Sequence, residues 1–173
     1  MRVTFLNDNS SNDLEKTGRK YLASRASDFN FFEIFRWCES ERDFIKALKE
    51  QDYSNLDELE TYILQFKDLG DFNNYGLAFE YMEIDERDPV VNGDYFRYQL
   101  SWGGPSDEVR FYADGRIEYV YLDWFCGVGF DVSNEDWAAW LAEHFEECMM
   151  LDFDAKREET YYYEILYSEE DSD

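Results

Sequence analysis

Hydrophobic side chains recur at helical spacing in the first 70 residues. After Asn55, a run of apolar residues at intervals of three, three, one and three predicts an amphipathic helix that ends at Gly70. Upstream we expect a short strand over 2–6, a helix from Ser11 or Asn12 to about Ser24, a second from Ser27 to Trp37, and a third after Ser40 and Asp43. Ser40 and Asp43 have the spacing of a capping box, which marks where a helix begins.

The hydrophobic period changes from helical spacing to two at residue 77, which is typical of strands. We expect strands over 77–84, 95–102, 108–113 and 116–124, a hairpin turn at Asp114–Gly115, and a last strand over 160–167. Short connections between them favour an antiparallel meander. Between these strands, Ser133 and Asp136 are expected to begin a helix with two Trp residues, DWAAWLAEHFEECMM.

These patterns predict an α+β fold with N-terminal helices and an antiparallel β-meander covered by the Trp-rich amphipathic helix. We expect two parts, a helical N-terminal subdomain over 1–70 and, over 71–173, the sheet with one long helix and an acidic C-terminal tail. A length of 173 residues suits one domain or two small subdomains.

Charge narrows the classes of function. With 16 Lys and Arg against 41 Asp and Glu, the formal net charge is −25. Binding of a nucleic acid or of an anionic membrane surface needs clustered bases, so both are disfavoured for this chain. Disorder is also disfavoured, because 45% of the residues are hydrophobic and 20% are aromatic.

The chain lacks the sequence marks of export. Its first residues, MRVTFLNDNSSNDLE, contain no apolar signal region, and no apolar run is long enough for a membrane helix. Cys38, Cys126 and Cys148 are odd in number and widely spaced, which argues against a disulfide framework. We therefore expect a protein of a reducing cytoplasm, that of a bacterial host cell.

One block of the chain resembles a known group of proteins. Residues 95–125 contain the series SWGGPSDE, RIEY and LDWF, and this block resembles small uncharacterised proteins of phages, plasmids and other mobile elements. Its Gly103-Gly104-Pro105 and its Trp and Tyr residues are interpreted as turn and sheet-packing residues. Size and acidity are separately similar to those of DNA-mimic antirestriction proteins of the ArdA and Ocr kind and of some anti-CRISPR proteins. That similarity implies an inhibitor of host defence.

The sequence contains only weak signals for catalytic or metal-binding groups. His144 and Cys148 share a helix face and are a possible nucleophile pair, or two metal ligands joined by Cys126, but we favour a buried stripe. Glu83 with Asp85, or Glu118 with Asp123, could act as an acid and a base. Asp85, Glu86 and Asp88 could bind calcium, although the spacing is not that of an EF-hand. We expect no enzyme activity and no cofactor.

The acids themselves are the leading candidate site. Carboxylates three or four residues apart on a helix lie about 5–6 Å apart at Cβ, a spacing similar to that of DNA phosphates. The expected partner-binding residues are Asp57, Glu58, Glu60, Glu83, Asp85, Glu86, Asp88, Glu135, Asp136, Glu143, Glu146, Glu147, Asp152 and Asp154.

This array predicts a nucleic-acid mimic without catalytic activity. It would bind the basic groove of a bacterial defence complex, a CRISPR effector or a restriction enzyme, as an inhibitor. The alternative is an immunity or antitoxin-like protein that neutralises a basic toxin through a small hot spot.

Overall fold

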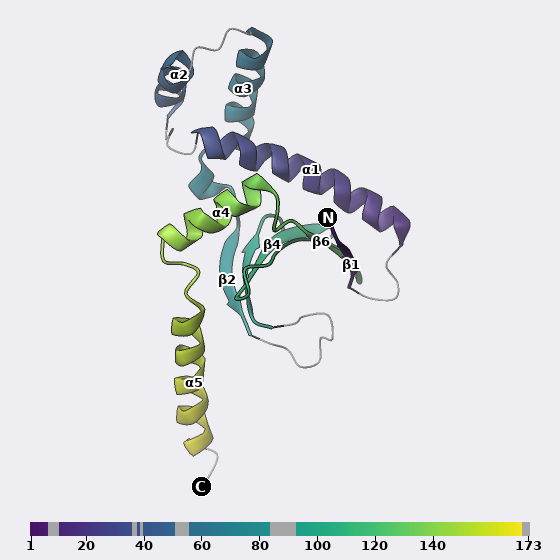
Figure 1. Cartoon of the computed structure of the whole chain (residues 1–173), viewed down its shortest axis with the longest axis vertical. Coiled ribbons are helices and arrows are strands. Elements are labelled where there is room, and N and C mark those ends of the chain that lie inside the picture. The colour runs from purple at the N-terminus through teal and green to yellow at the C-terminus, as the bar shows by residue number, and fades with distance from the viewer. Residues whose placement is uncertain (7–10, 36–37, 39, 51–55, 84–92, 171–173) are drawn as a thin grey trace.

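A six-stranded antiparallel sheet with helices on one face forms the body of the protein (Figure 1), which confirms the α+β class. The computed structural model describes the chain except residues 7–10, 36–37, 39, 51–55, 84–92 and 171–173. The helices are α1 (Asn12–Phe35), α2 (Glu41–Glu50), α3 (Leu56–Leu69), the 3-10 turn η1 (Phe72–Asn74), α4 (Asp136–Glu147) and α5 (Phe153–Glu170). The strands are β1 (Val3–Phe5), β2 (Ala78–Met82), β3 (Tyr95–Gln99), β4 (Ser106–Tyr112), β5 (Ile117–Asp123) and β6 (Cys126–Asp131).

The sheet is a meander with one added strand. Its order is β1-β6-β5-β4-β3-β2, so each strand from β2 to β6 lies beside the next in sequence. The first strand of the chain pairs with the last, Val3 opposite Phe130. At the β4–β5 hairpin, Gly115 has φ +83°, a conformation that glycine adopts without strain, which confirms the expected turn.

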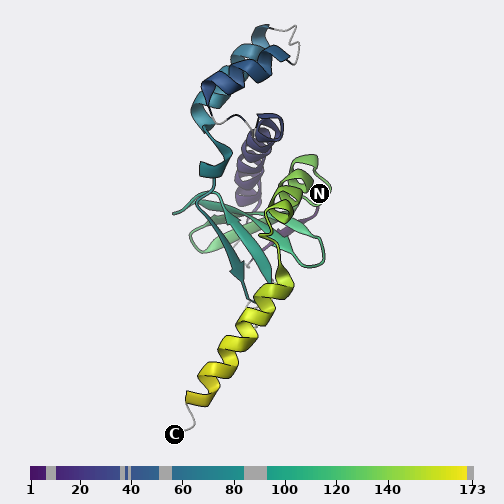
Figure 2. The same cartoon turned by 90° about the vertical axis from the view of Figure 1, so that its left-hand side faces the viewer.

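Helices α1 and α4 cover one face of this sheet (Figures 1 and 2). The Trp137 ring of α4 stacks on Phe29 of α1 at a centroid distance of 5.2 Å. Phe145 lies about two turns further along the buried side of α4 and contacts the strand residues Tyr98 and Phe111. The Trp-rich helix therefore covers the meander as expected, and the aromatic side chains supply most of the buried area.

Helix α1 is continuous, where the sequence predicted two helices with a break near Ser24. A Cβ on Gly18 would lie 2.9 Å from side-chain atoms of both Phe130 and Val128, so the absent side chain lets the helix lie directly on β6. The glycine that weakened the sequence prediction is thus a packing position.

Two segments near the C-terminus differ from the prediction. Residues 126–131, for which the sequence predicted no element, form β6; a Cβ on Gly127 would collide with Leu6 at 2.5 Å. The expected strand over 160–167 is wrong, because this segment belongs to helix α5. The Asp152 carboxylate accepts a hydrogen bond from the Ala155 amide at 3.0 Å and so caps that helix.

The start of α4 also differs. Glu135 occupies the N-cap position without a side-chain hydrogen bond, so the predicted Ser133 cap is wrong. The Ser133 hydroxyl instead accepts a hydrogen bond from the Ile117 amide at 2.9 Å and donates one to Asp131 at 2.7 Å. Ser133 therefore joins the end of β6 to β5 rather than beginning the helix.

The ends of the shorter helices follow the expected signals. The Asp43 amide donates to the Ser40 hydroxyl at 3.2 Å, as in a capping box, and Gly70 ends α3 with φ +69°. β1 and α1, assigned to the first subdomain, pack with the sheet, and one hydrophobic cluster includes Leu14, Phe44 and Phe145. The division at residue 70 stays a prediction.

Candidate functional site

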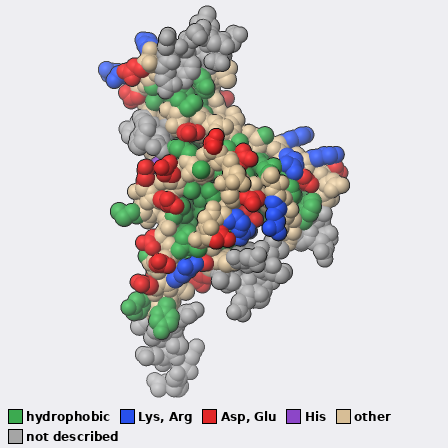
Figure 3. Space-filling view, in the orientation of Figure 1, with side chains coloured by type: hydrophobic (Ala, Val, Ile, Leu, Met, Phe, Trp, Pro, Cys, Tyr) green, Lys and Arg blue, Asp and Glu red, His purple; other side chains and the backbone are tan. Residues whose placement is uncertain are grey.

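Exposed carboxylates follow α4 and α5 along one side of the molecule. We call this set the α4–α5 acid surface: Glu135, Asp136, Glu143, Glu146, Glu147, Asp152, Asp154, Glu158 and Glu159. All nine side chains are exposed, because the hydrophobic stripe of α4 is turned to the sheet and α5 projects away from the sheet (Figure 1). Acidic atoms accordingly follow this side in Figure 3; basic atoms are most numerous on the right of that view, with others at the top and beside the acidic atoms of the lower part.

Few bases accompany the acid surface. Within 135–162 the only cations are Lys156 and Arg157. Lys156 pairs with Glu159 at 2.7 Å, and Arg157 contacts Asp154 at 3.7 Å. The carboxylates of α4 have no ion pair with any residue that the structure describes. Their charges are therefore available to a partner.

One ion pair fixes α5 on the body of the protein. Arg157 donates two hydrogen bonds to Asp94, at 2.7 and 2.8 Å, and the Tyr81 hydroxyl donates a third at 2.7 Å. The Arg157 hydrogen bond and charge hold the pKa of Asp94 below its usual value. Burial and the bond to Asp94 raise the pKa of Tyr81 to about 12. These contacts set the direction in which α5 presents its acids.

The remaining predicted site residues do not share one position: one lies beside α5 and another lies on α3. Glu60 is exposed on α3, away from the acid surface, and Glu83 is exposed after β2, where it accepts a hydrogen bond from Thr160 at 2.9 Å. The side chains of Asp57 and Glu58, and all of Asp85, Glu86 and Asp88, lie outside the described residues. The structure thus brings together the predicted acids of 135–154, adds Glu158 and Glu159, and places Glu60 apart.

Glu158 and Glu159 were missed because 160–167 was read as a strand. A helix signal was present in the sequence: Asp152 precedes a run of helix-forming residues, DAKREE. Reading that cap would have placed both acids on the same helix as Asp154.

A second group of charges is buried and fully paired. Arg25 of α1 donates to both oxygens of Asp107 on β4, at 2.7 and 3.0 Å, and to the Tyr75 hydroxyl at 2.8 Å. Asp107 also accepts from Tyr119 at 2.8 Å and from Ser101. Burial raises the pKa of Tyr119, and the neighbouring Asp107 adds to the rise. This network joins α1 to the sheet, and each group in it has its partner.

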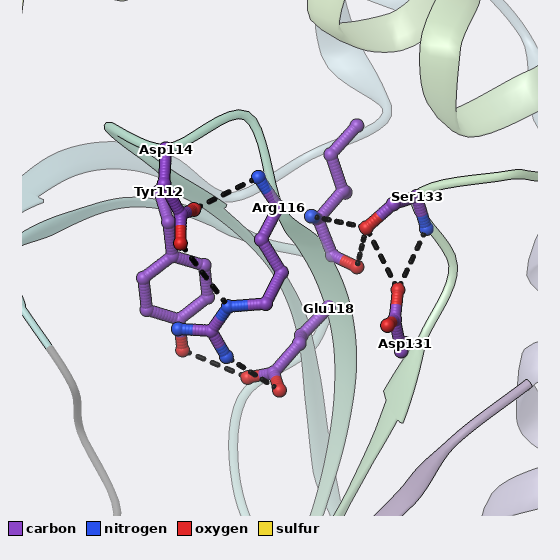
Figure 4. A network of polar contacts seen from close by, with 7 residues as sticks. Tyr112, Asp114, Arg116, Glu118, Asp131 and Ser133 are labelled. Carbon is purple, nitrogen blue, oxygen red and sulfur yellow. Dashed lines mark hydrogen bonds and ion pairs between the residues drawn. The ribbon is translucent and has the colours of Figure 1, made fainter.

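A third network lies at the turn end of the β4–β5 hairpin (Figure 4). Arg116 lies over the Tyr112 ring at 3.8 Å and donates to Glu118 at 2.9 Å, while Tyr112 donates to the same carboxylate at 2.8 Å. Beside it, hydrogen bonds from Ser133 lower the pKa of Asp131. These contacts are typical of sheet stabilisation.

Glu118 and Asp123, named as a possible acid–base pair, are not brought together. Both residues lie on β5, five positions apart, which places them on opposite faces and about 17 Å from each other. Glu118 is already occupied by Tyr112 and Arg116. The other pair, Glu83 with Asp85, falls partly outside the described residues.

His144 and Cys148 do not form the buried stripe that the sequence suggested. The His144 ring packs edge-on against Phe72 at 4.9 Å and is half-buried, whereas Cys148 is exposed at the end of α4. Among the described residues, no group of three or more His, Cys, Asp or Glu side chains is gathered for a metal ion. Nor does any described helix have the length and apolar character needed to cross a membrane.

Comparison with known proteins finds no relative: no family model, no curated protein and no solved structure matches the chain. The candidate site is therefore defined by its own chemistry. It is a set of exposed carboxylates on two successive helices, and along α4 these carboxylates have no counterion among the residues that the structure describes.

Proposed function

We propose that the protein is an acidic nucleic-acid mimic that acts in the cytoplasm of a bacterial host. It would occupy the basic nucleic-acid groove of a defence complex, a CRISPR effector or a restriction enzyme, and inhibit that complex without catalysis. The observation that carries the proposal is the α4–α5 acid surface, whose α4 carboxylates have no ion pair with a described residue.

The size of the surface supports this mode of binding. Helix α4, with 12 residues, is about 18 Å long, or roughly five base-pair steps, and the acids of α5 from Asp154 to Glu159 extend over about 8 Å more. Carboxylates at 143, 146 and 147 lie on one side of α4 with Cβ atoms about 5–6 Å apart. Groove Arg and Lys that hold phosphates would pair with them by charge-assisted hydrogen bonds.

The test compares two variants of equal net charge. In the surface variant, Glu143, Glu146 and Glu147 become Gln; in the matched control, Glu33→Gln, Glu41→Gln and Asp68→Asn remove three exposed charges from α1, α2 and α3. Each protein is immobilised and used to capture partners from lysates of bacterial hosts, with and without excess duplex DNA or RNA. Affinity for the captured complex is then measured at several salt concentrations.

We expect one defence nuclease or CRISPR subunit to bind wild type and control, and nucleic acid to displace it. The surface variant should bind about tenfold more weakly, with a smaller dependence on salt. Binding that ignores nucleic acid would contradict mimicry and favour the immunity or antitoxin-like alternative. Equal weakening by both variants would mean that net charge, and not this surface, determines binding.

A further inference from the structure

Three large aromatic side chains are exposed together at one end of the sheet. Asp123 pairs with Cys126, so Trp124 and Phe125 form the two-residue loop between β5 and β6, and their side chains are 82% and 83% exposed. Trp102, in the β3–β4 connection at the same end, is 79% exposed. We call Trp102, Trp124 and Phe125 the aromatic tip. The Trp residues of this block were interpreted as turn and sheet-packing residues; Trp102 and Trp124 both lie in connections between strands, with exposed rings.

The backbone of the tip is shaped around these rings. Trp124 has φ +52°, a left-handed conformation that two-residue hairpin loops normally reserve for Gly, Asn or Asp. A Cβ on Gly104 would lie 3.1 Å from the Trp124 ring, so the glycine loop accepts the ring edge. A bulky residue in a strained conformation, with its ring in solvent, contributes little to the fold and points to an external role.

The surroundings of the tip favour a cation. A depression of about 280 Å³ beside the turn is lined by Asp123, by Cys126 and by Asp13 at the start of α1, whose carboxylate also has an exposed contact of 3.7 Å with Lys16. Arg side chains stack on Trp faces and pair with carboxylates, and both groups are present here. Lipid phosphates and nucleic-acid phosphates would be repelled by a chain of net charge −25.

We propose that the aromatic tip binds an arginine-bearing segment of a basic partner protein, with a guanidinium on the Trp rings and its charge toward Asp123 or Asp13. This inference rests on the proposed function, since both require a basic partner. It adds a second contact, and this contact selects Arg over Lys. The acid surface alone attracts both residue types equally, because it acts through charge. The tip would then supply the aromatic anchor that protein interfaces commonly use.

The test uses oligoarginine and oligolysine peptides of equal length as probes of the whole chain. The tip variant carries Trp102→Ser, Trp124→Gly and Phe125→Ser; Gly suits the backbone at 124, and thermal unfolding verifies that the variant folds. The matched control carries Tyr161→Ala and Tyr162→Ala, two exposed aromatics on α5. The surface variant of α4 is measured beside them at physiological salt by calorimetry.

We expect wild type and the tyrosine control to bind oligoarginine about fivefold more tightly than oligolysine, and the tip variant to bind both equally. An unchanged preference in the tip variant overturns the inference while leaving the acid surface intact. If instead the tip variant loses the preference and the α4 variant binds both peptides like wild type, the inference holds and the proposed function fails. Absence of binding by wild type contradicts both.

Discussion

Charges in the sheet and charges on α4 and α5 are arranged in opposite ways. In and around the sheet, arginines pair with acids: Arg25 with Asp107, and Arg110 with Glu108 at 2.6 Å. On α4 the carboxylates are exposed and have no such partner among the described residues. Within 135–162 acids therefore far outnumber bases, whereas arginines in and around the sheet are used in pairs with acids.

This difference separates what holds the fold together from what is available to a partner. A buried charge pair is costly to break, since the remaining charge is left without a counterion or water. An exposed carboxylate costs little to remove and repels its neighbours. Substitutions in the two regions should therefore have opposite effects on stability and on binding.

The largest effect is expected from Asp107→Asn. The variant keeps the shape of the side chain but removes the buried carboxylate from Arg25, whose own side chain is 20% exposed, so we expect the free energy of unfolding to fall by about 3 kcal/mol. Urea unfolding measures the loss. Glu147→Gln on α4 serves as the control and should change stability by less than about 0.5 kcal/mol. A loss below about 1 kcal/mol for Asp107→Asn would show that the network does not hold α1 on the sheet.

A smaller effect is expected from Glu118→Gln. This carboxylate accepts from Arg116 and Tyr112 but is partly exposed, so solvent compensates for part of the lost interaction. We expect the free energy of unfolding to fall by about 1 kcal/mol in the same urea experiment. A loss equal to that of Asp107→Asn would contradict the role assigned to burial.

The dependence of thermal stability on salt should distinguish the exposed acids of α4 from the buried charge pairs of the sheet. Screening weakens repulsion between exposed carboxylates, so the melting temperature of the wild-type protein should rise with added sodium chloride. In the variant with Gln at 143, 146 and 147 this rise should be smaller, and stability at low salt should be equal to or slightly above that of wild type. A melting temperature that falls with salt would mean that attractive pairs dominate the surface.

The smallest and most local effect concerns pH and the position of α5. The pKa of Asp94 is lowered by Arg157, so its stabilisation is complete above the ordinary value of 3.8 and is lost as the pH falls through the lowered pKa. We expect backbone NMR signals of α5 to shift in that acidic range. In Asp94→Asn these signals should already differ at neutral pH and should lose this transition. An identical transition in both proteins would assign it to another group.

Most of the fold could be predicted from the sequence. In the exceptions, the residues' local preferences are overridden by the structure around them. Alternating residues in 95–99 and the turn at Asp114–Gly115 predicted the meander, because both signals are local. β6 was missed because its glycines are unfavourable in strands by themselves, and Gly127 is explained only by the Leu6 and Leu122 side chains packed close to it. α5 was misread because its Tyr-rich segment has strand propensity, although the segment continues a capped helix.

The sequence predicted part of the candidate site. Acids at 135–154 could be placed on an exposed surface, because the hydrophobic stripe of α4 identifies the opposite side of that helix. Exposure of Trp124 and Phe125 could not be foreseen, because aromatic residues next to strands are usually buried. Only the pairing of Asp123 with Cys126 shows that these two residues form the loop itself.

The pairing of β1 with β6 has a consequence for how the chain folds. Val3 can find Phe130 only after most of the polypeptide has been synthesised, so this contact closes one of the longest loops in the chain. Contacts of such sequence separation slow folding, whereas the β4–β5 hairpin can form early. Until β1 arrives, β6 is an open strand edge that can pair with another chain, and assembly of the sheet is most vulnerable to aggregation at that step.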